Sequence, residues 1–401
     1  MTFNAASQTG FTPTGQLHFG VNLLGPAAQL GFDELRTLAQ TAERGLFSLL
    51  TLDERYWLRE DPGAVSATDP SGSNDVATLL AALAAVTENI GLVAAAAPDY
   101  DDPADLTRRL AALDSISARR AAWHVLADGA IYGDAALESD NEGIASADGR
   151  RSLIESTRRD WEALAKEDPK GPVETLGAFE RDGQLYSVGL GALRQCESNR
   201  GPVIIHDAES AHDVASADFA DVIISVAASL EEALTFRRDV VARSREAGRG
   251  ADAVKIIQTA TFVMAPTADE AVERADWMRE QLPDSVWDAR TFVGSYAGVA
   301  EILLDFARSG AVDGFTVMPW LFADELADIV NHLVPELQAR GAYPADYAAS
   351  TLRENLGLSG RGPGIKGGAT HTLPVIEVGD LDDVRLDLDL RMEVIVQKLQ
   401  A

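Results

Sequence analysis

Eight short apolar segments alternate with amphipathic segments along most of the chain. The apolar segments lack a regular polar alternation, which is typical of parallel strands buried on both faces. Strand–helix alternation predicts a parallel α/β sheet, and eight units predict its closure into a (β/α)8 TIM barrel, with an open doubly wound sheet as the alternative. The predicted strands are 17–23, 47–52, 90–95, 121–126, 202–206, 221–226, 255–264 and 313–318.

The segments between these strands carry apolar residues at helical spacing. In Phe32–Arg44, for example, Leu35, Leu38 and Ala42 fall on one stripe that can pack against a sheet. Further helices are predicted at 74–87, 103–117, 230–247, 268–281, 297–309 and 323–341.

Two connections are longer than ordinary barrel loops. Residues 127–201 follow the fourth strand and contain a predicted helix near 152–166, and residues 265–312 follow the seventh strand. Long insertions in compact domains often form lids or binding walls. We predict a barrel domain over 1–358 and a C-terminal extension over 359–401. We interpret the extension as an arm or a small appendage, for which a subunit interface is one location, and we expect a homo-oligomer.

The net charge of −29 limits the classes of partner. Such a surface repels nucleic-acid phosphates and anionic lipids, so neither nucleic acid nor membrane is an expected partner. Residues 1–15 lack the basic start and apolar run of a signal peptide, and Cys196 is the single cysteine, which excludes an intramolecular disulfide. These features predict a cytoplasmic protein.

Common nucleotide-binding and hydrolase motifs are missing. Gly189-Leu190-Gly191 begins like a dinucleotide-binding loop, but Arg194 stands where the third glycine belongs. The chain contains no phosphate-binding loop ending in Lys-Ser or Lys-Thr, no Gly-x-Ser-x-Gly and no His-Glu-x-x-His. The first strand offers one histidine, His18, where a metal-dependent barrel hydrolase would have two, so no metal is expected.

Six segments, in order along the chain, carry a resemblance to a known family. They are "LAQTAERGLFSLLTLD" (38–53), "LLAALAAVTENIGL" (79–92), "DDPADLTRRLAALDSISARRAAWHV" (101–125), "GPVIIHDAES" (201–210), "GAVDGFTVMP" (310–319) and "LVPELQARGAYPADYAASTLRENLGL" (333–358). Together they resemble the bacterial luciferase-like flavin-dependent monooxygenases. Within that family, the chain is similar to the branch containing the nitrilotriacetate, dibenzothiophene-sulfone and long-chain alkane monooxygenases.

The resemblance implies an enzyme that uses reduced flavin mononucleotide (FMNH2) and O2 to oxidise a small organic molecule. A separate reductase would supply the reduced flavin, because the chain has no nicotinamide-binding fold of its own. The insertion at 127–201 would close a dry pocket. Two alternatives stay open: a non-catalytic or weakly flavin-binding subunit, and a deazaflavin-dependent reductase, whose class lacks the ending at 333–358.

The resemblance also implies positions for the flavin ring. Asp53, at the end of the second strand, would lie beside it; the structural alternative is an N-cap or turn acid. His124 ends the fourth strand where relatives carry Asn, and there it could hydrogen-bond the flavin or donate a proton, which makes it the candidate catalytic residue. The alternative for His124 is a core histidine facing the helices. Trp123 and His124 must point to opposite faces of the strand.

The implied phosphate side includes Ser210, with its hydroxyl and the first N–H groups of a following helix. A plain N-cap is its structural alternative. Two small residues in the implied cofactor site differ from the family pattern, since Ala97 replaces a serine and Ala208 a glycine. Met318 and Trp320 are predicted to form an apolar wall, for which core packing is the simpler explanation.

Other departures concern the phosphate itself. A His and a Tyr that clasp it in relatives fall near Gly143 and Ala147. Asp207, Glu209 and Asp213 surround the implied phosphate position. A carboxylate about 5 Å from a phosphate charge costs roughly 3 kcal/mol at an effective dielectric near 20, and a helix N-terminus returns about 1 kcal/mol.

Flavin binding is therefore predicted to be weaker here than in relatives, unless an arginine offsets the repulsion. The candidates for that role are Arg119, Arg120, Arg150 and Arg151.

Overall fold

The computed structural model describes most of the chain between residues 16 and 358. The described residues are 16–23, 30–53, 75–96, 103–126, 147–166, 175–181, 184–189, 201–208, 210, 213–250, 253–281, 290–318 and 322–358. The predicted extension, 359–401, lies outside them, so the division at residue 358 stays a prediction.

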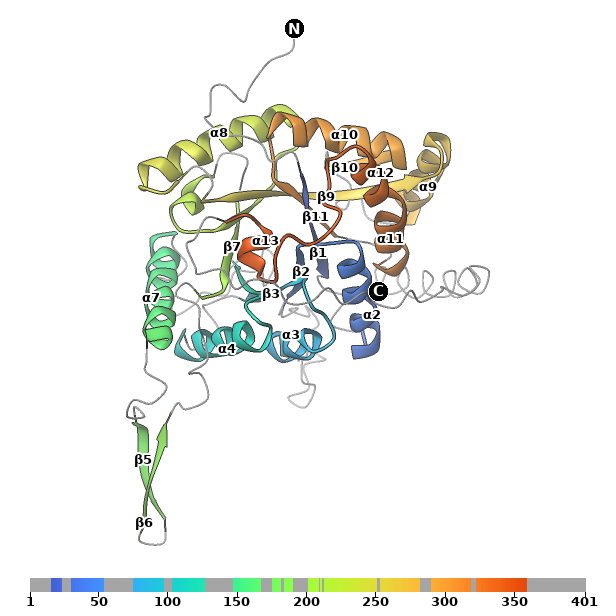
Figure 1. The fold of residues 1–401 in the computed structure, drawn as a ribbon. Helices are drawn as coiled ribbons and strands as arrows, with labels where there is room; N and C mark the ends of the chain where they lie inside the picture. The colour runs from blue at the N-terminus through green and yellow to red at the C-terminus, as the bar shows by residue number, and fades with distance from the viewer. Residues whose placement is uncertain are drawn as a thin grey trace, which may run out of the picture.

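Eight parallel strands close into a barrel (Figure 1). Their order around the ring is β9-β11-β1-β2-β3-β4-β7-β8, and β8 pairs with β9 to complete it. The bounds are β1 (His18–Leu23), β2 (Leu49–Asp53), β3 (Gly91–Ala96), β4 (Ala121–Val125), β7 (Val203–Asp207), β8 (Val222–Ser225), β9 (Lys255–Ala265) and β11 (Gly314–Val317). The eight predicted strands and the TIM barrel are confirmed, and the open sheet is excluded.

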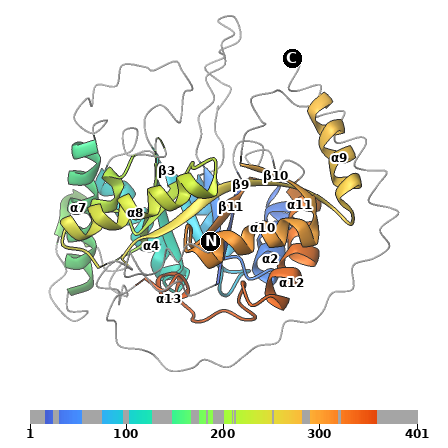
Figure 2. The same ribbon diagram turned by 90° about the horizontal axis from the view of Figure 1, so that it is seen from above.

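Helices cover the outside of the barrel (Figure 2). They are α2 (Phe32–Arg44), α3 (Val76–Ala84), α4 (Pro103–Ile116), α7 (Ala147–Lys166), α8 (Leu230–Glu246), α9 (Ala268–Gln281), α10 (Tyr296–Ser309), α11 (Phe322–Asp328) and α12 (Val334–Ala339). The short helix α13 (Leu352–Asn355) lies instead at the N-terminal end of the barrel. Local signals explain the ends of α10: the Ser295 side chain accepts a hydrogen bond from the Gly298 N–H, and Gly310 ends the helix with φ +67°.

Three details of the fold differ from the sequence prediction. The single helix expected at 323–341 is divided by a π-helical segment, η4 (Ile329–Leu333). An additional strand, β10 (Thr291–Ser295), pairs with the outer half of β9, which continues beyond the ring. The insertion after β4 contains α7, as predicted, and also the hairpin of β5 (Thr175–Arg181) and β6 (Gln184–Gly189), which Figure 1 shows apart from the barrel.

The barrel strands separate two apolar cores. Phe19, Trp123 and Ile204 belong to the outer core, between the strands and the helices. The inner core consists of Leu49, Val93, Ala122, Val203, Ile205, Val222, Ile224, Ile257, Leu352, Leu356 and Leu358. Because α13 contributes Leu352 and the Leu352 N–H donates to the Arg119 carbonyl just before β4, this segment closes the N-terminal end of the barrel.

Candidate active site

Polar side chains of the barrel interior gather at the C-terminal ends of the strands. The strand register aligns Asp53 of β2 with Ala95 of β3, Ala95 with His124 of β4, and His124 with Ile205 of β7. Catalytic groups of TIM barrels come from this end, because the loops that follow the strands converge there. The aliphatic inner core lies beneath and closes the opposite end.

His124 lies on the inner face of β4. Its neighbour Ala122 belongs to the inner core, whereas Trp123 packs in the outer core and donates from Nε1 to the Ala96 carbonyl. The imidazole is buried, and its Nε2 lies 3.0 Å from Oδ2 of Asp207. The orientation is the one that a flavin-facing histidine requires, and its catalytic role stays a prediction.

Asn22 is a residue of this site that sequence reasoning missed. Phe19, Val21 and Leu23 join the outer core, so alternation places Asn22 on the inner face of β1, near its C-terminal end. Its Oδ1 is buried and accepts no hydrogen bond within the described part of the chain. An unsatisfied buried oxygen is costly unless a ligand or water supplies a donor. The signal in the sequence is a polar side chain near the C-terminal end of a strand that is otherwise apolar after His18.

The remaining predicted ring-side residues are only partly visible. Asp53 is the last residue of β2, at the predicted end of the barrel, and its side chain is outside the description. Met318 follows β11 and is half-buried, in agreement with a wall position. Ala97 and Trp320 lie outside the described residues.

The structure describes the phosphate side only in part, because residues 209, 211 and 212 lie outside the described residues. Ser210 follows β7 at the same end of the barrel, but the next helical element in the described residues is a 3-10 helix, η2 (Ala215–Asp218). No N-terminal α-helical turn therefore starts at Ser210 itself in that part of the chain. The Ala208 N–H donates to the Ile224 carbonyl and is used by the sheet, so it is not offered to a phosphate.

Two of the three acidic residues have partners that sequence reasoning did not foresee. Asp207 points to His124, as described, and its side chain is half exposed. Asp213 accepts from the Ala215 N–H through Oδ1, at the start of η2. Glu209 lies outside the described residues. The three carboxylates are therefore not equivalent sources of the predicted repulsion of the phosphate, because Asp207 and Asp213 already interact with other groups.

Two of the four candidate arginines lie at the other end of the barrel. Arg119 and Arg120 precede β4 and so lie at the opposite end of the barrel, where Arg120 is buried. The Arg120 guanidinium donates to carbonyls of Ala84, Thr87, Ile90 and Ser117 and to the Thr87 hydroxyl. Both are thus excluded from a phosphate site at the C-terminal end.

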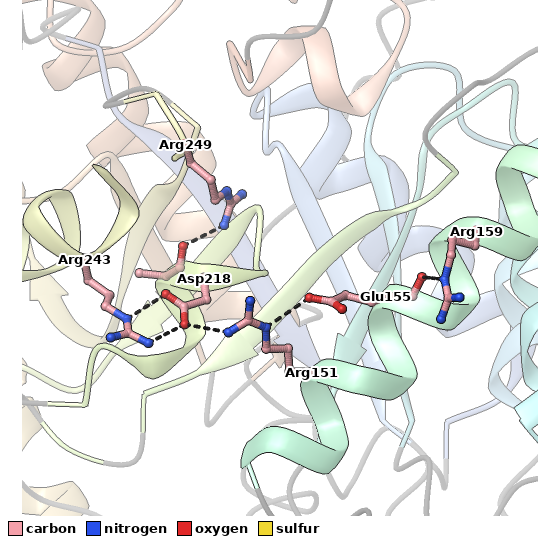
Figure 3. Close-up of polar contacts among 7 residues, drawn as sticks. Arg151, Glu155, Arg159, Asp218, Arg243 and Arg249 are labelled. Carbon is pink, nitrogen blue, oxygen red and sulfur yellow. Dashed lines mark hydrogen bonds and ion pairs between the residues drawn. The ribbon is translucent and has the colours of Figure 1, made fainter. Parts of the chain in front are cut away.

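Arg151 connects α7 to η2 (Figure 3). It donates to Glu155 and to Asp218, and Asp218 also pairs with Arg243. Because these acceptors occupy its guanidinium, Arg151 is a poor candidate for binding a phosphate.

Arg150 is a candidate whose charge reaches β7. It lies in the first turn of α7 and is buried, and its charge acts on His206 of β7. Burial lowers the pKa of His206, and the positive charge of Arg150 lowers it further. Ala147, the position of the missing tyrosine, is the first residue of the same helix, whereas Gly143 lies outside the described residues.

No group of three metal-ligating side chains occurs among the described residues. None of the helices in that part of the chain has the length and apolarity to cross a membrane.

The sequence profile of the luciferase-like monooxygenases matches residues 14–313. The chain belongs to this family. It is 30% identical to one subunit of the pristinamycin IIA synthase of Streptomyces pristinaespiralis, over 82% of this chain and 90% of that protein. It is 25% identical to nitrilotriacetate monooxygenase component A of Aminobacter aminovorans, over 80% of this chain and 89% of that protein. The predicted family is confirmed, and the family is one of flavin-dependent enzymes.

The fold also matches solved structures. A riboflavin lyase crystallised with modified FMN and riboflavin superimposes with a TM-score of 0.65, at 21% identity, over 85% of this chain and 95% of that one. At this identity the similarity supports the fold.

The inner residues fit a flavin. A flavin ring is flat, largely apolar, and carries both N–H and carbonyl groups at its edges. The mouth, meaning the C-terminal end of the barrel, offers the Asn22 oxygen, which is unsatisfied among the described residues, and the imidazole of His124. Between β2 and β4 it also offers the small side chain of Ala95. The aliphatic inner core beneath provides an apolar support.

Proposed function

We propose that this chain is the oxygenase component of a two-component monooxygenase that uses FMNH2. One oxygen atom of O2 enters a small organic substrate, and the other leaves as water with the two hydrogens of the reduced flavin, which ends oxidised. The observation that carries the proposal is the polar inner mouth of the barrel, with Asn22, His124 and Asp207 above an aliphatic interior. A mouth of this kind suits a ring with polar edges and excludes water from beneath it.

The residues have separate tasks in this proposal. His124 contacts the flavin or the reacting oxygen and holds or donates a proton, since imidazole exchanges protons near neutral pH. Asn22 accepts from a donor on the cofactor edge, and Asp53 lies beside the ring. Ser210 and Arg150 bind the phosphate; the buried charge of Arg150, which acts on His206 of β7, supports this assignment.

The partners follow from the same reasoning. The described residues form one barrel without a second nucleotide-binding sheet, so a separate reductase supplies the reduced flavin. The name "component A" of one relative supports this arrangement. The strongly negative chain disfavours bulky anionic substrates, and we expect a neutral, small organic substrate. Assembly as a homo-oligomer is part of the proposal.

The decisive experiment is an anaerobic titration of the protein with FMNH2, followed by mixing with O2. The absorption spectrum and oxygen uptake are compared with those of free FMNH2. We expect saturable binding and a changed course of flavin oxidation. Spectra and oxygen uptake identical to free flavin would instead favour the non-catalytic alternative. Binding of a reduced deazaflavin in preference to FMNH2 would favour the reductase alternative.

A further inference from the structure

We propose that Asp207 is the positioning residue of His124: its carboxylate orients the imidazole and keeps a proton on Nε2. The consequence for turnover rests on the proposed function, because His124 can affect oxidation only if this site oxidises a substrate. The pairing itself rests on the geometry of two adjacent strands.

The barrel register brings the two side chains together. His124 of β4 is aligned with Ile205 of β7, and Asp207 stands two residues further along β7, on the same inner face. Nε2 of His124 lies 3.0 Å from Oδ2 of Asp207, an ion-pair contact that does not have hydrogen-bond direction in this structure. The side chain of His124 is 8% exposed and that of Asp207 is 46% exposed, so the carboxylate stays hydrated at the mouth while the imidazole is buried beneath it.

The strand backbone holds Asp207 in place. Asp207 is aligned with Ile224 of β8, and its carbonyl oxygen accepts a hydrogen bond of 2.7 Å from Nδ1 of His206. His206 points to the opposite face and packs edge-on against Phe219. These contacts fix the main chain at Asp207, from which the carboxylate reaches His124.

A carboxylate at this distance has two effects on an imidazole. It selects the neutral form that bears a proton on the facing nitrogen, and it stabilises the imidazolium formed when the ring gains a second proton. Among the described side chains, the other titratable or charged groups near the pair are His206 and Arg150, across β7. Asp207 is the carboxylate in direct reach of Nε2.

This role differs from the one that the sequence predicted for Asp207, which was repulsion of the flavin phosphate. If the residue acted on the phosphate by repulsion, its removal would tighten flavin binding. If Asp207 positions His124, removal of the carboxylate leaves flavin affinity unchanged and alters the orientation and tautomer of the His124 imidazole instead. A measurement of flavin affinity in a variant without this carboxylate therefore distinguishes the two roles.

The test uses the full chain labelled with nitrogen-15 histidine and no flavin. The protein has six histidines, and loss of one signal in His124→Gln assigns the ring. We expect neutral His124 to carry its proton on Nε2. Asp207→Ala should give a mixture of the two tautomers, Asp207→Asn should keep the Nε2–H form because the amide oxygen still accepts, and Asp239→Ala, at an exposed ion pair of α8, should change nothing. A proton on Nδ1 in the wild type, or an unchanged tautomer in Asp207→Ala, overturns the proposal.

Turnover and flavin affinity complete the test. If the wild-type protein is active, Asp207→Ala should lower kcat by about tenfold or more. The kcat of Asp207→Asn should lie between those of Asp207→Ala and the wild type. The Kd for FMNH2 of both variants should stay within about twofold of the wild-type value. Unchanged kcat, or clearly tighter flavin binding, overturns the positioning role. If the tautomer result is as expected but the wild type consumes no O2, the pair stands and the proposed oxygenase function fails.

Discussion

Asp53 and His124 lie level with each other on two strands of the barrel, each aligned with Ala95 of the strand between them. Residues 71 positions apart thus meet at one rim because β2, β3 and β4 are consecutive and parallel. In this row the small residue Ala95 lies between the two polar residues Asp53 and His124, so substitutions of Asp53 and of His124 should affect the same site.

Replacing His124 should separate catalysis from stability. We expect His124→Ala to lose product formation or to release hydrogen peroxide instead of product, while unfolding free energy falls by only about 1 kcal/mol, since the partner Asp207 can be solvated. His124→Asn should retain much of the activity because its amide keeps a donor and an acceptor. Peroxide and product assays, with thermal melts, measure both effects.

The control is His332→Ala, at an exposed histidine stacked on Tyr296. It should leave turnover unchanged. A stable His124→Ala protein with normal product yield would remove His124 from the mechanism.

Arg150 and Arg151 offer a matched pair for the phosphate side. Arg150→Met should weaken FMN binding by about tenfold, or about 1.4 kcal/mol, because a buried cation near the end of β7 is lost. Arg151→Met should have little effect, since Arg151 is already paired with Glu155 and Asp218. Calorimetry with FMN measures the two Kd values, and equal effects in both variants would contradict this assignment.

Glu209, the third acidic residue predicted near the phosphate, can also be tested by calorimetry with FMN. Glu209→Ala should tighten FMN binding if its charge repels the phosphate. Calorimetry showing unchanged or weaker affinity would argue against that repulsion.

His18 should make stability depend on pH. Burial lowers the pKa of His18 from 6.5, the usual value for an exposed histidine, to about 4. Between these pH values the unfolded chain binds a proton that the folded chain lacks, so the stabilisation is complete above pH 6.5 and is lost as the pH falls towards 4. The loss amounts to roughly 3 kcal/mol.

The measurement is a series of urea unfolding curves from pH 7 to pH 4. His18→Asn, whose amide can still meet the Ser48 hydroxyl, should flatten the curve relative to the wild type. Asp114 acts in the opposite direction, because burial raises its pKa to about 6, and it contributes equally to both proteins. Parallel pH curves for the two proteins would show that His18 is not responsible.

Leu352 tests the closure of the N-terminal end by α13. Leu352→Ala should lower the unfolding free energy by about 2–5 kcal/mol, because the side chain is buried in the inner core and its removal leaves a cavity. Ile116→Ala, at a side chain that is 61% exposed, is the control and should change stability by less than about 0.5 kcal/mol. Similar urea midpoints for the two variants would mean that α13 does not seal the barrel.

Much of the fold could be predicted because its signals are local. The apolar run at 313–318 and the helical stripe of Phe32–Arg44 follow from periods that neighbouring residues impose, and both occur as predicted. The short strand β10 was missed, since it forms only by adding to the outer half of β9. The division of 323–341 by η4 likewise depends on the packing of that helix.

The sequence by itself determined the barrel and the end of the barrel at which His124 lies, because strand order and side-chain alternation follow from local pattern. The resemblance of six segments indicated the family. Only the tertiary structure decided that Asp207 faces His124, that the Asn22 oxygen is unsatisfied among the described residues, and that Arg150 rather than Arg120 lies near β7. The physical reason is that charge and hydrogen-bond partners are set by distances of a few ångströms. Those distances exist only after closure brings residues far apart in the chain onto adjacent strands.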